Sequence, residues 1–295
     1  MPSSRSASPI SRSSETEPRL GPAFAALARK LALAPLLVGQ AIATRRRAPL
    51  LPEAAGPREG RIGEGRGPPL SILIAGDSSA AGVGVANQDV AVAGYLVRAL
   101  HRHVGRPIEW TLRARSGLTT RGVHALLASD PPAPVAFAIV ISGVNDVVDQ
   151  IGARRAIRHR TALADWLLGS GLARHVVFAP LPPMHRFPLL PEPLRRVLGD
   201  DACRHDRSLA CWAATRGDVS HVKIVLDING EVMASDGFHP GEPVYRVCGE
   251  ALAAHVARRI GPARREAFAA TRQLRHTEPN GSRSPGRRQE DEEDR

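Results

Sequence analysis

Short runs of apolar residues alternate with longer amphipathic stretches between residues 70 and 260. The short runs are rich in Val, Ile and Leu and stop at Gly, Pro or polar residues, which is typical of parallel strands buried on both faces. They are Leu70–Ala75, Ile108–Ala114, Val135–Ser142, His175–Ala179 and Val222–Asp227. The stretches with helical spacing are Asp89–His103, Thr119–Ser129, Ala153–Leu168, Pro191–Thr215 and Pro243–Ile260. This alternation predicts an α/β protein, a three-layer α/β/α sandwich with about five parallel strands.

Polar residues cluster directly after four of these predicted strands. In doubly wound sheets, ligands bind beyond the carboxyl ends of the strands, so polar residues at those ends are candidates for a functional site. The four clusters are Gly76–Gly84, Ser116–Thr119, Gly143–Asp146 and Ser235–Gly241. They come from distant parts of the chain, but the predicted sheet places them at one edge. We therefore expect a single site assembled from four loops.

Three residues in these clusters fit nucleophilic catalysis. The hydroxyl of Ser78 would become a good nucleophile if a base took its proton, and neutral histidine is the natural base near neutral pH. A carboxylate at the second ring nitrogen of His239 would hold the base in one tautomer. Asp236 precedes His239 by three residues, so one turn can bring them together, and Pro240 restricts His239 to extended backbone angles. The pattern predicts Ser78 as nucleophile, His239 as base and Asp236 as the residue that orients the base.

Such a mechanism also needs hydrogen-bond donors that are fixed around the oxyanion before it forms. The candidates are the backbone N–H of Ser78, the backbone N–H of Gly117 and the side-chain amide of Asn145. Gly117 has no side chain, which allows a ligand to approach its backbone closely. Asn145 offers two uncharged N–H donors. These three groups form the predicted oxyanion hole.

The four clusters resemble the signature blocks of the SGNH (GDSL-like) hydrolase family. The matching residues are Gly76-Asp77-Ser78, Gly117, Gly143-Val144-Asn145-Asp146 and Asp236-Gly237-Phe238-His239. The first block here reads GDSS where the family has GDSL, and that last position is not catalytic in the family. The resemblance covers roughly residues 70–260. It implies a flavodoxin-like fold, the same catalytic triad and oxyanion hole, and hydrolysis of a carboxylic ester through an acyl-enzyme.

The resemblance leaves the natural substrate open among lipid esters, lysophospholipids, thioesters and small acyl esters, including acetylated sugars. The Pro- and Leu-rich stretch 180–199 favours an acyl chain over a sugar, although the same residues would suit a packed loop. Read singly, Ser78 could be a helix cap, and Asp236 and His239 could be turn residues. The alternative function is a non-catalytic binding module of the same fold, which would use the basic N-terminal arm to contact membrane or nucleic acid.

The charge distribution and the cysteine content limit the classes of binding partner that we expect. The formal net charge is +11 at pH 7, and more than half of the excess lies outside residues 70–260. Aromatic residues do not interleave with the basic ones, as they often do on nucleic-acid-binding surfaces. The pairs His101 with His103 and Cys203 with His205 lack metal-ligand spacing, and the three cysteines form no CxxC motif. We expect a small-molecule or lipid ester as partner, and no nucleic acid, metal or cofactor.

The two ends of the chain have a different composition from the middle. Residues 1–69 predict a basic N-terminal arm with a short apolar segment and a linker, residues 70–260 the hydrolase domain, and residues 261–295 a charged, disordered tail. The apolar segment 31–43 is shorter than the ~18 residues of a membrane-spanning helix. We predict a cytoplasmic protein with peripheral membrane contact through residues 23–47. A structural helix, or export through a signal-like segment, are the alternatives.

Overall fold

The computed structural model describes residue 28, residues 30–64 and residues 67–260. The chain divides into two units, Met1–Arg47 and Ala48–Arg295. In the first unit, helix α2 (Ala34–Arg47) ends with three consecutive arginines and buries none of its residues. The second unit contains the sheet and all four polar clusters. The predicted C-terminal tail, 261–295, lies outside the described residues.

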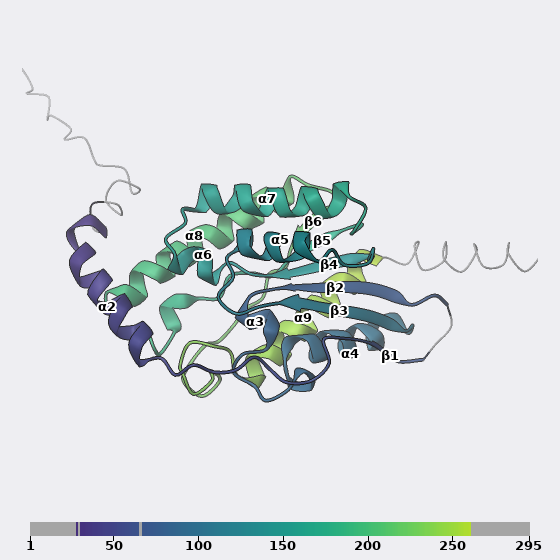
Figure 1. Cartoon of the computed structure of the whole chain (residues 1–295), viewed down its shortest axis with the longest axis horizontal. Helices are drawn as coiled ribbons and strands as arrows, with labels where there is room; N and C mark the ends of the chain where they lie inside the picture. Colours follow the sequence, from purple (N-terminus) through teal and green to yellow (C-terminus); the bar gives the residue numbers. More distant parts are fainter. Residues whose placement is uncertain (1–27, 29, 65–66, 261–295) are drawn as a thin grey trace, which may run out of the picture. The chain divides into compact units, whose positions relative to one another are not determined.

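A six-stranded sheet forms the centre of the larger unit (Figure 1). Its strands are β1 (Glu59–Ile62), β2 (Leu70–Gly76), β3 (Ile108–Ala114), β4 (Phe137–Ile141), β5 (Val176–Phe178) and β6 (Val219–His221). They lie side by side in the order β1-β3-β2-β4-β5-β6. The five strands β2 to β6 are parallel to their neighbours, and β1 pairs with β3 in the antiparallel direction.

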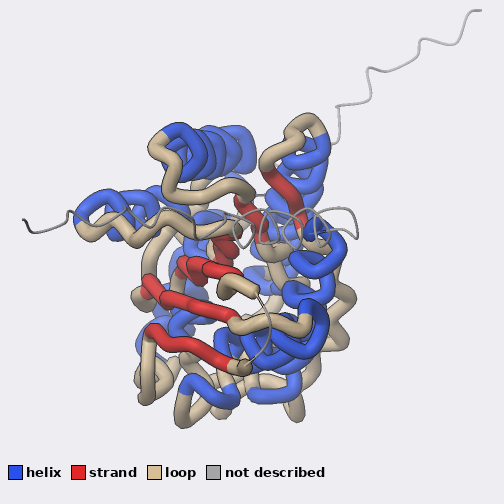
Figure 2. Tube along the Cα trace, turned by 90° about the vertical axis from the view of Figure 1, so that its right-hand side faces the viewer, coloured by secondary structure: helices blue, strands red, loops and turns tan. Residues whose placement is uncertain are grey.

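Helices cover both faces of this sheet, which confirms the predicted three-layer sandwich (Figures 1 and 2). The longer helices are α4 (Val92–Val104), α5 (Thr120–Ser129), α7 (Ala153–Gly169), α8 (Leu194–Ala214) and α9 (Glu242–Ile260). One face carries α4 packed on α9, and the other carries α5, α7 and α8. The short elements are α3 (Ser78–Ala81), η1 (Gln88–Val90), α6 (Val144–Val148) and η2 (Met184–Arg186).

The central strands are apolar throughout because helices cover them on both sides. Ile72, Leu73 and Ile74 of β2 are completely buried. On one face of the sheet, β2 packs against α4 and α9, whose inward residues include Leu96 and Leu252. A strand buried in this way is rigid, so the loop after it begins from a fixed point.

The fifth predicted strand, Val222–Asp227, is wrong in its position. The strand beside β5 is β6, Val219–His221, and its last bond to β5 is from the Val222 N–H to the Phe178 oxygen at 3.1 Å. The segment that follows β5, beyond Phe178, contains three prolines, which have no N–H to continue the hydrogen-bonded ladder: Pro180, Pro182 and Pro183. The apolar segment 222–228 therefore leaves the sheet, although its sequence has strand character.

The compact unit also begins earlier than the predicted boundary at Leu70. Strand β1 lies within the predicted linker, and polar contacts tie the chain before it to the domain. The Glu53 carboxylate accepts hydrogen bonds from the backbone N–H of Ser116 at 2.7 Å and from its hydroxyl at 2.9 Å. Arg58 donates to the Ala114 oxygen at 2.7 Å. Hydropathy did not predict these contacts because β1 is a largely exposed edge strand.

No helix among the described residues is both long and apolar enough to cross a membrane. In the same part of the chain, no group of three or more His, Cys, Asp or Glu side chains is arranged to hold a metal ion.

Candidate active site

The sheet register brings the polar clusters together. Gly76 at the end of β2 pairs with Ala114 of β3 and with Ile141 of β4, so these three strands end at the same level. A Cβ atom on Gly76 would lie 2.0 Å from the Ile141 oxygen, so only glycine fits where the strands approach this closely. The clusters after β2, β3 and β4 consequently share one edge of the sheet, as predicted. The fourth cluster lies between β6 and α9.

Ser78 is the first residue of α3, the four-residue helix that follows β2. Asp77 caps this helix, with its carboxylate accepting a hydrogen bond from the Ser79 N–H at 3.0 Å. The helix cap is therefore Asp77 and not Ser78, which leaves the Ser78 hydroxyl available. That hydroxyl lies 3.1 Å from Nε2 of His239.

His239 is held from its other side by Asp236. The His239 Nδ1 atom lies 2.5 Å from Oδ2 of Asp236. The second carboxylate oxygen of Asp236 accepts hydrogen bonds from the backbone N–H groups of Phe238 and His239, each at 2.9 Å. One turn of four residues thus fixes both side chains, as the spacing predicted. Hydrogen bonds therefore connect the three predicted residues in one series: Ser78, His239 and Asp236.

Electrostatic interactions determine which atoms carry the protons in the hydrogen-bonded series Ser78, His239 and Asp236. Burial of Asp236 favours its neutral form, but the hydrogen bonds from the His239 ring and from two backbone N–H groups outweigh burial and lower the pKa of Asp236. A charged carboxylate only accepts hydrogen bonds, so Nδ1 of His239 carries the ring proton. Nε2 then has a free lone pair and accepts the Ser78 hydroxyl hydrogen. This is the arrangement that a general base requires.

Of the other two predicted oxyanion-hole residues, Gly117 lies in the loop before α5 and Asn145 is the second residue of α6. Gly117 is exposed and has a φ of 81°, a backbone conformation that favours glycine. The Asn145 amide donates to the backbone oxygen of Leu118, the residue after Gly117, at 3.0 Å. Asn145 and the Gly117 loop are therefore in direct contact, and one amide N–H of Asn145 remains available.

A buried polar cluster supports these loops. The Asp146 carboxylate accepts hydrogen bonds from the backbone N–H of Thr120 at 3.0 Å and from its hydroxyl at 2.6 Å. The Arg160 guanidinium lies 3.5 Å from Asp146, and both side chains are fully buried. Arg160 also lies against Gly143, where the turn that carries Asn145 begins. Asp146 therefore links the start of α5, just after Gly117, to the Asn145 turn.

Thr120 and Arg160 belong to this cluster, although no sequence pattern indicated them. An arginine within a helix is usually a solvated residue, and a threonine at the start of a helix is usually a cap. Asp146 belonged to a recognised cluster, but nothing in that cluster indicated a buried arginine as its partner. The position of Arg160 opposite Asp146 depends on how α7 packs on the sheet.

Asp77 is the other buried acid at this edge. Burial raises the pKa of Asp77 to about 7, against the hydrogen bond from the Ser79 N–H and the nearby His239 ring, which lower it. Its ordinary value is 3.8, so burial moves the titration of Asp77 to near neutral pH. Asp77 lies next to the proposed nucleophile Ser78 in sequence, and its charge interacts electrostatically with the His239 ring.

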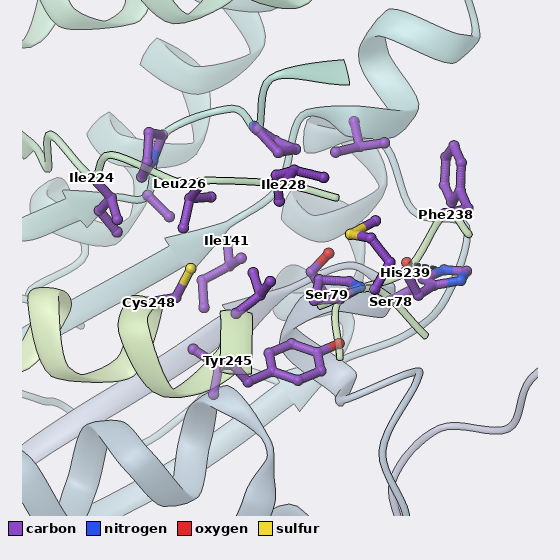
Figure 3. Close-up of a pocket in the computed structure, with 18 of the residues that line it drawn as sticks. Ser78, Ser79, Ile141, Ile224, Leu226, Ile228, Phe238, His239, Tyr245 and Cys248 are labelled. Carbon is purple, nitrogen blue, oxygen red and sulfur yellow. Dashed lines mark hydrogen bonds between the residues drawn. The ribbon is translucent and has the colours of Figure 1, made fainter. Parts of the chain in front are cut away.

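An apolar pocket opens beside Ser78 and His239 (Figure 3). Apolar side chains from the end of β4, from the proline-rich chain after β5, from segment 222–228 and from α9 line it. Apart from His239, no acidic or basic side chain lines the pocket. The Tyr245 hydroxyl donates to the Val83 oxygen at 2.6 Å, so it is occupied.

Residues 74–247 match the model of the GDSL-like lipase/acylhydrolase family. The chain belongs to this family. The GDSL-like esterase Rv1075c of Mycobacterium tuberculosis is 26% identical to the chain over 237 residues, which cover 74% of each protein. The match confirms the resemblance found in the sequence, and this GDSL-like family member is an ester hydrolase.

The fold of this GDSL-like hydrolase also occurs in solved structures. The lipase Lip_vut3 from a goat rumen metagenome aligns with a TM-score of 0.53 and 15% identity, covering 63% of this chain and 96% of the lipase. That similarity shows the common fold. The residues before 70 and after 260 lie outside the stretch that the four motifs span.

Proposed function

We propose that the protein hydrolyses a carboxylic ester through an acyl-enzyme formed on Ser78. The observation that carries the proposal is the continuous hydrogen-bonded chain from Ser78 through His239 to Asp236, at distances of 3.1 and 2.5 Å. The chain lies at the edge of an apolar pocket, where a nonpolar part of an ester could bind.

In the first half of the reaction, Nε2 of His239 removes the proton from the Ser78 hydroxyl as Oγ attacks the ester carbonyl carbon. The carbonyl π electrons move to the oxygen, and the N–H groups of Ser78 and Gly117 and the Asn145 amide stabilise the resulting oxyanion. When the carbonyl re-forms, the bond to the alcohol oxygen breaks. The protonated His239 gives its proton to that oxygen, and the alcohol leaves.

In the second half, water replaces the alcohol. His239 removes a proton from water, the hydroxide oxygen attacks the acyl carbon, and the same donors hold the second oxyanion. Collapse of this intermediate breaks the bond to Ser78 Oγ, which takes back the proton from His239. Asp236 keeps its charge throughout and stabilises the imidazolium. The products are a carboxylic acid and an alcohol, and the enzyme is regenerated.

Labelling with a fluorophosphonate probe tests this proposal, because the probe reacts with activated serines. We expect the probe to modify Ser78, as identified by peptide mass spectrometry, and to abolish cleavage of p-nitrophenyl butyrate. Ser78→Ala should lose labelling and reduce kcat on the order of 10⁴-fold or more. Ser79→Ala is the matched control and should retain both. Labelling at Ser79 would move the nucleophile, and a protein with neither labelling nor turnover would favour a binding module.

A further inference from the structure

The pocket beside Ser78 is elongated and leads away from the catalytic residues. Figure 3 shows Ile224, Leu226 and Ile228 in a row on one side, with Tyr245 and Cys248 on the other. Ser78 and His239 lie at one end, and Ile224 and Cys248 lie at the opposite end. The pocket therefore has its reactive group at one end and apolar walls along its length.

The first wall exists because segment 222–228 leaves the sheet. Its exposure alternates as in a strand: Ile224, Leu226 and Ile228 line the pocket, and Val225, which is 85% exposed, points away. Arg186 donates a hydrogen bond to Asp227 on the outer side and so ties the segment to η2. The neighbouring prolines prevent the ladder from continuing, which leaves room between this segment and the rest of the fold.

The second wall is one face of α9. Val244, Tyr245, Cys248 and Leu252 line the pocket at helical spacing. The residues from 244 to 252 span about 12 Å along the helix axis, at 1.5 Å per residue. Burial raises the pKa of the Cys248 thiol to about 12, so this thiol is neutral and part of an apolar surface. A sugar would find few hydrogen-bond partners between these walls, and its hydroxyl groups would lose their water.

We propose that this pocket binds the acyl chain of the substrate ester, an unbranched chain of medium length such as octanoyl. This inference rests on the proposed function, because it assigns the chain to the half of the ester that becomes bonded to Ser78. The acyl half stays on Ser78 until water releases it, so a pocket that adjoins Ser78 suits this half. The alcohol takes its proton from the partly exposed His239 and departs toward solvent. Each methylene that the pocket buries raises kcat/KM roughly fourfold.

Two isomeric esters provide the most direct test. Ethyl octanoate and octyl acetate have the same composition, but the eight-carbon chain is on the acyl side in the first and on the alcohol side in the second. We expect kcat/KM for ethyl octanoate to exceed that for octyl acetate at least tenfold, measured by proton release in a pH-stat. Equal values, or a preference for octyl acetate, would overturn the acyl assignment even if Ser78 is the nucleophile.

Two neighbouring residues provide matched variants. Ile224→Phe fills the far end of the pocket and should lower the ratio of kcat/KM for ethyl octanoate to that for ethyl acetate at least tenfold. Val225→Phe introduces the same ring on the outward side of the segment and should leave that ratio unchanged. Ile224→Ala enlarges the far end and should raise the ratio for ethyl decanoate over ethyl octanoate. If both Phe variants change the ratio equally, the segment acts through the fold and the pocket proposal is wrong.

A binding measurement separates this inference from catalysis. The Ser78→Ala protein should bind octanoate in isothermal titration calorimetry with a negative heat-capacity change, the signature of apolar burial. Adding Ile224→Phe should weaken that binding at least tenfold. Failure of octanoate to bind, in a protein whose wild type is labelled at Ser78, would remove the pocket proposal and leave the hydrolase mechanism standing. Octanoate binding without any labelling of Ser78 would support the pocket as an apolar binding site and contradict the hydrolase mechanism.

Discussion

At the scale of single residues, the side-chain amide of Asn145 makes two separate contributions. One N–H donates to the Leu118 oxygen at 3.0 Å and fixes the orientation of the amide. The other N–H then points in a defined direction, which is what stabilisation of an oxyanion requires. The groups that carry out the proposed chemistry are individually ordinary, and their fixed orientation gives them their function.

Replacing Asn145 tests this contribution. Asn145→Ala should lower kcat about a hundredfold with a small change in KM, because the amide binds the oxygen more tightly once negative charge develops. Steady-state kinetics on p-nitrophenyl butyrate measures both constants. A loss confined to KM would show that Asn145 binds the ground state and would contradict its assignment to the oxyanion hole.

Asp77 gives the protein a specific pH dependence. Burial raises its pKa from 3.8 to about 7, so at pH 5 the folded protein holds a proton that the unfolded chain has lost. The contribution of Asp77 to stability is thus fully present below pH 3.8 and is lost as pH rises through about 7. Asp77→Asn keeps a side-chain oxygen for the helix cap but cannot ionise.

We therefore expect Asp77→Asn to stabilise the protein more at pH 8 than at pH 5. The gain should be about 2.5 kcal/mol larger at pH 8, because folded Asp77 keeps its proton from pH 5 to about pH 7, and each pH unit in that interval corresponds to ~1.4 kcal/mol. Urea denaturation of both proteins at the two pH values measures this difference. An equal effect at both pH values would mean that Asp77 does not titrate in this range.

At the scale of secondary-structure elements, α5 and α6 are joined by one carboxylate. Asp146 of α6 receives two hydrogen bonds from Thr120, the first residue of α5, and both residues are fully buried. The loop before α5 carries Gly117, and α6 carries Asn145. The backbone N–H of Gly117 and the amide of Asn145 are two donors of the proposed oxyanion hole. They are therefore positioned relative to each other through the contact between Thr120 and Asp146, which involves neither of them directly.

Removing the Thr120 hydroxyl should loosen this link. Thr120→Val conserves shape but deprives the Asp146 carboxylate of a hydrogen bond, which should cost about 1–3 kcal/mol of unfolding free energy. We also expect kcat to fall about tenfold, because the oxyanion donors lose their preorganisation. Thr120→Ser restores the hydroxyl and should recover most of kcat. If kcat in Thr120→Val is unchanged despite lower stability, the link is structural only.

At the scale of the whole molecule, the unit boundary lies at Ala48. Deleting residues 1–47 should leave a folded, active hydrolase, because Glu53, Arg58 and β1 remain in place. Deleting residues 1–69 removes those contacts and exposes the edge of β3, so this protein should melt at a clearly lower temperature or aggregate. Differential scanning calorimetry and activity on p-nitrophenyl butyrate compare the two deletions. Equal stability of the two proteins would show that residues 48–64 do not stabilise the domain.

The same deletion tests the membrane hypothesis. We propose that residues 23–47 contact anionic membranes, since three arginines at the end of α2 could each contribute about 1 kcal/mol near such a surface. Full-length protein should sediment with anionic vesicles at low salt and less at high salt, where charges are screened. Protein lacking residues 1–47 should not sediment. Equal sedimentation of both proteins would place any membrane contact elsewhere.

The sequence by itself determined the buried parallel strands and the position of the proposed catalytic residues. Continuous apolar runs are the direct consequence of burial on both faces, and residues that follow parallel strands must meet at one edge. The spacing of Asp236 and His239 is local, so one turn is enough to predict their contact. In each case, the interaction that determines the structure involves residues close together in sequence, so the local sequence pattern predicts it.

Only the tertiary structure decided where β6 ends, that residues 48–64 join the domain, and that Arg160 is buried against Asp146. The end of β6 depends on prolines in the segment that follows the neighbouring strand β5, some forty residues earlier in the sequence. Polar contacts of Glu53 and Arg58 hold the chain before β1, and β1 itself pairs with β3 at an exposed edge. Arg160 is buried by the packing of α7. The acyl pocket follows from the same cause, because it opens where a segment with strand character has no strand to pair with.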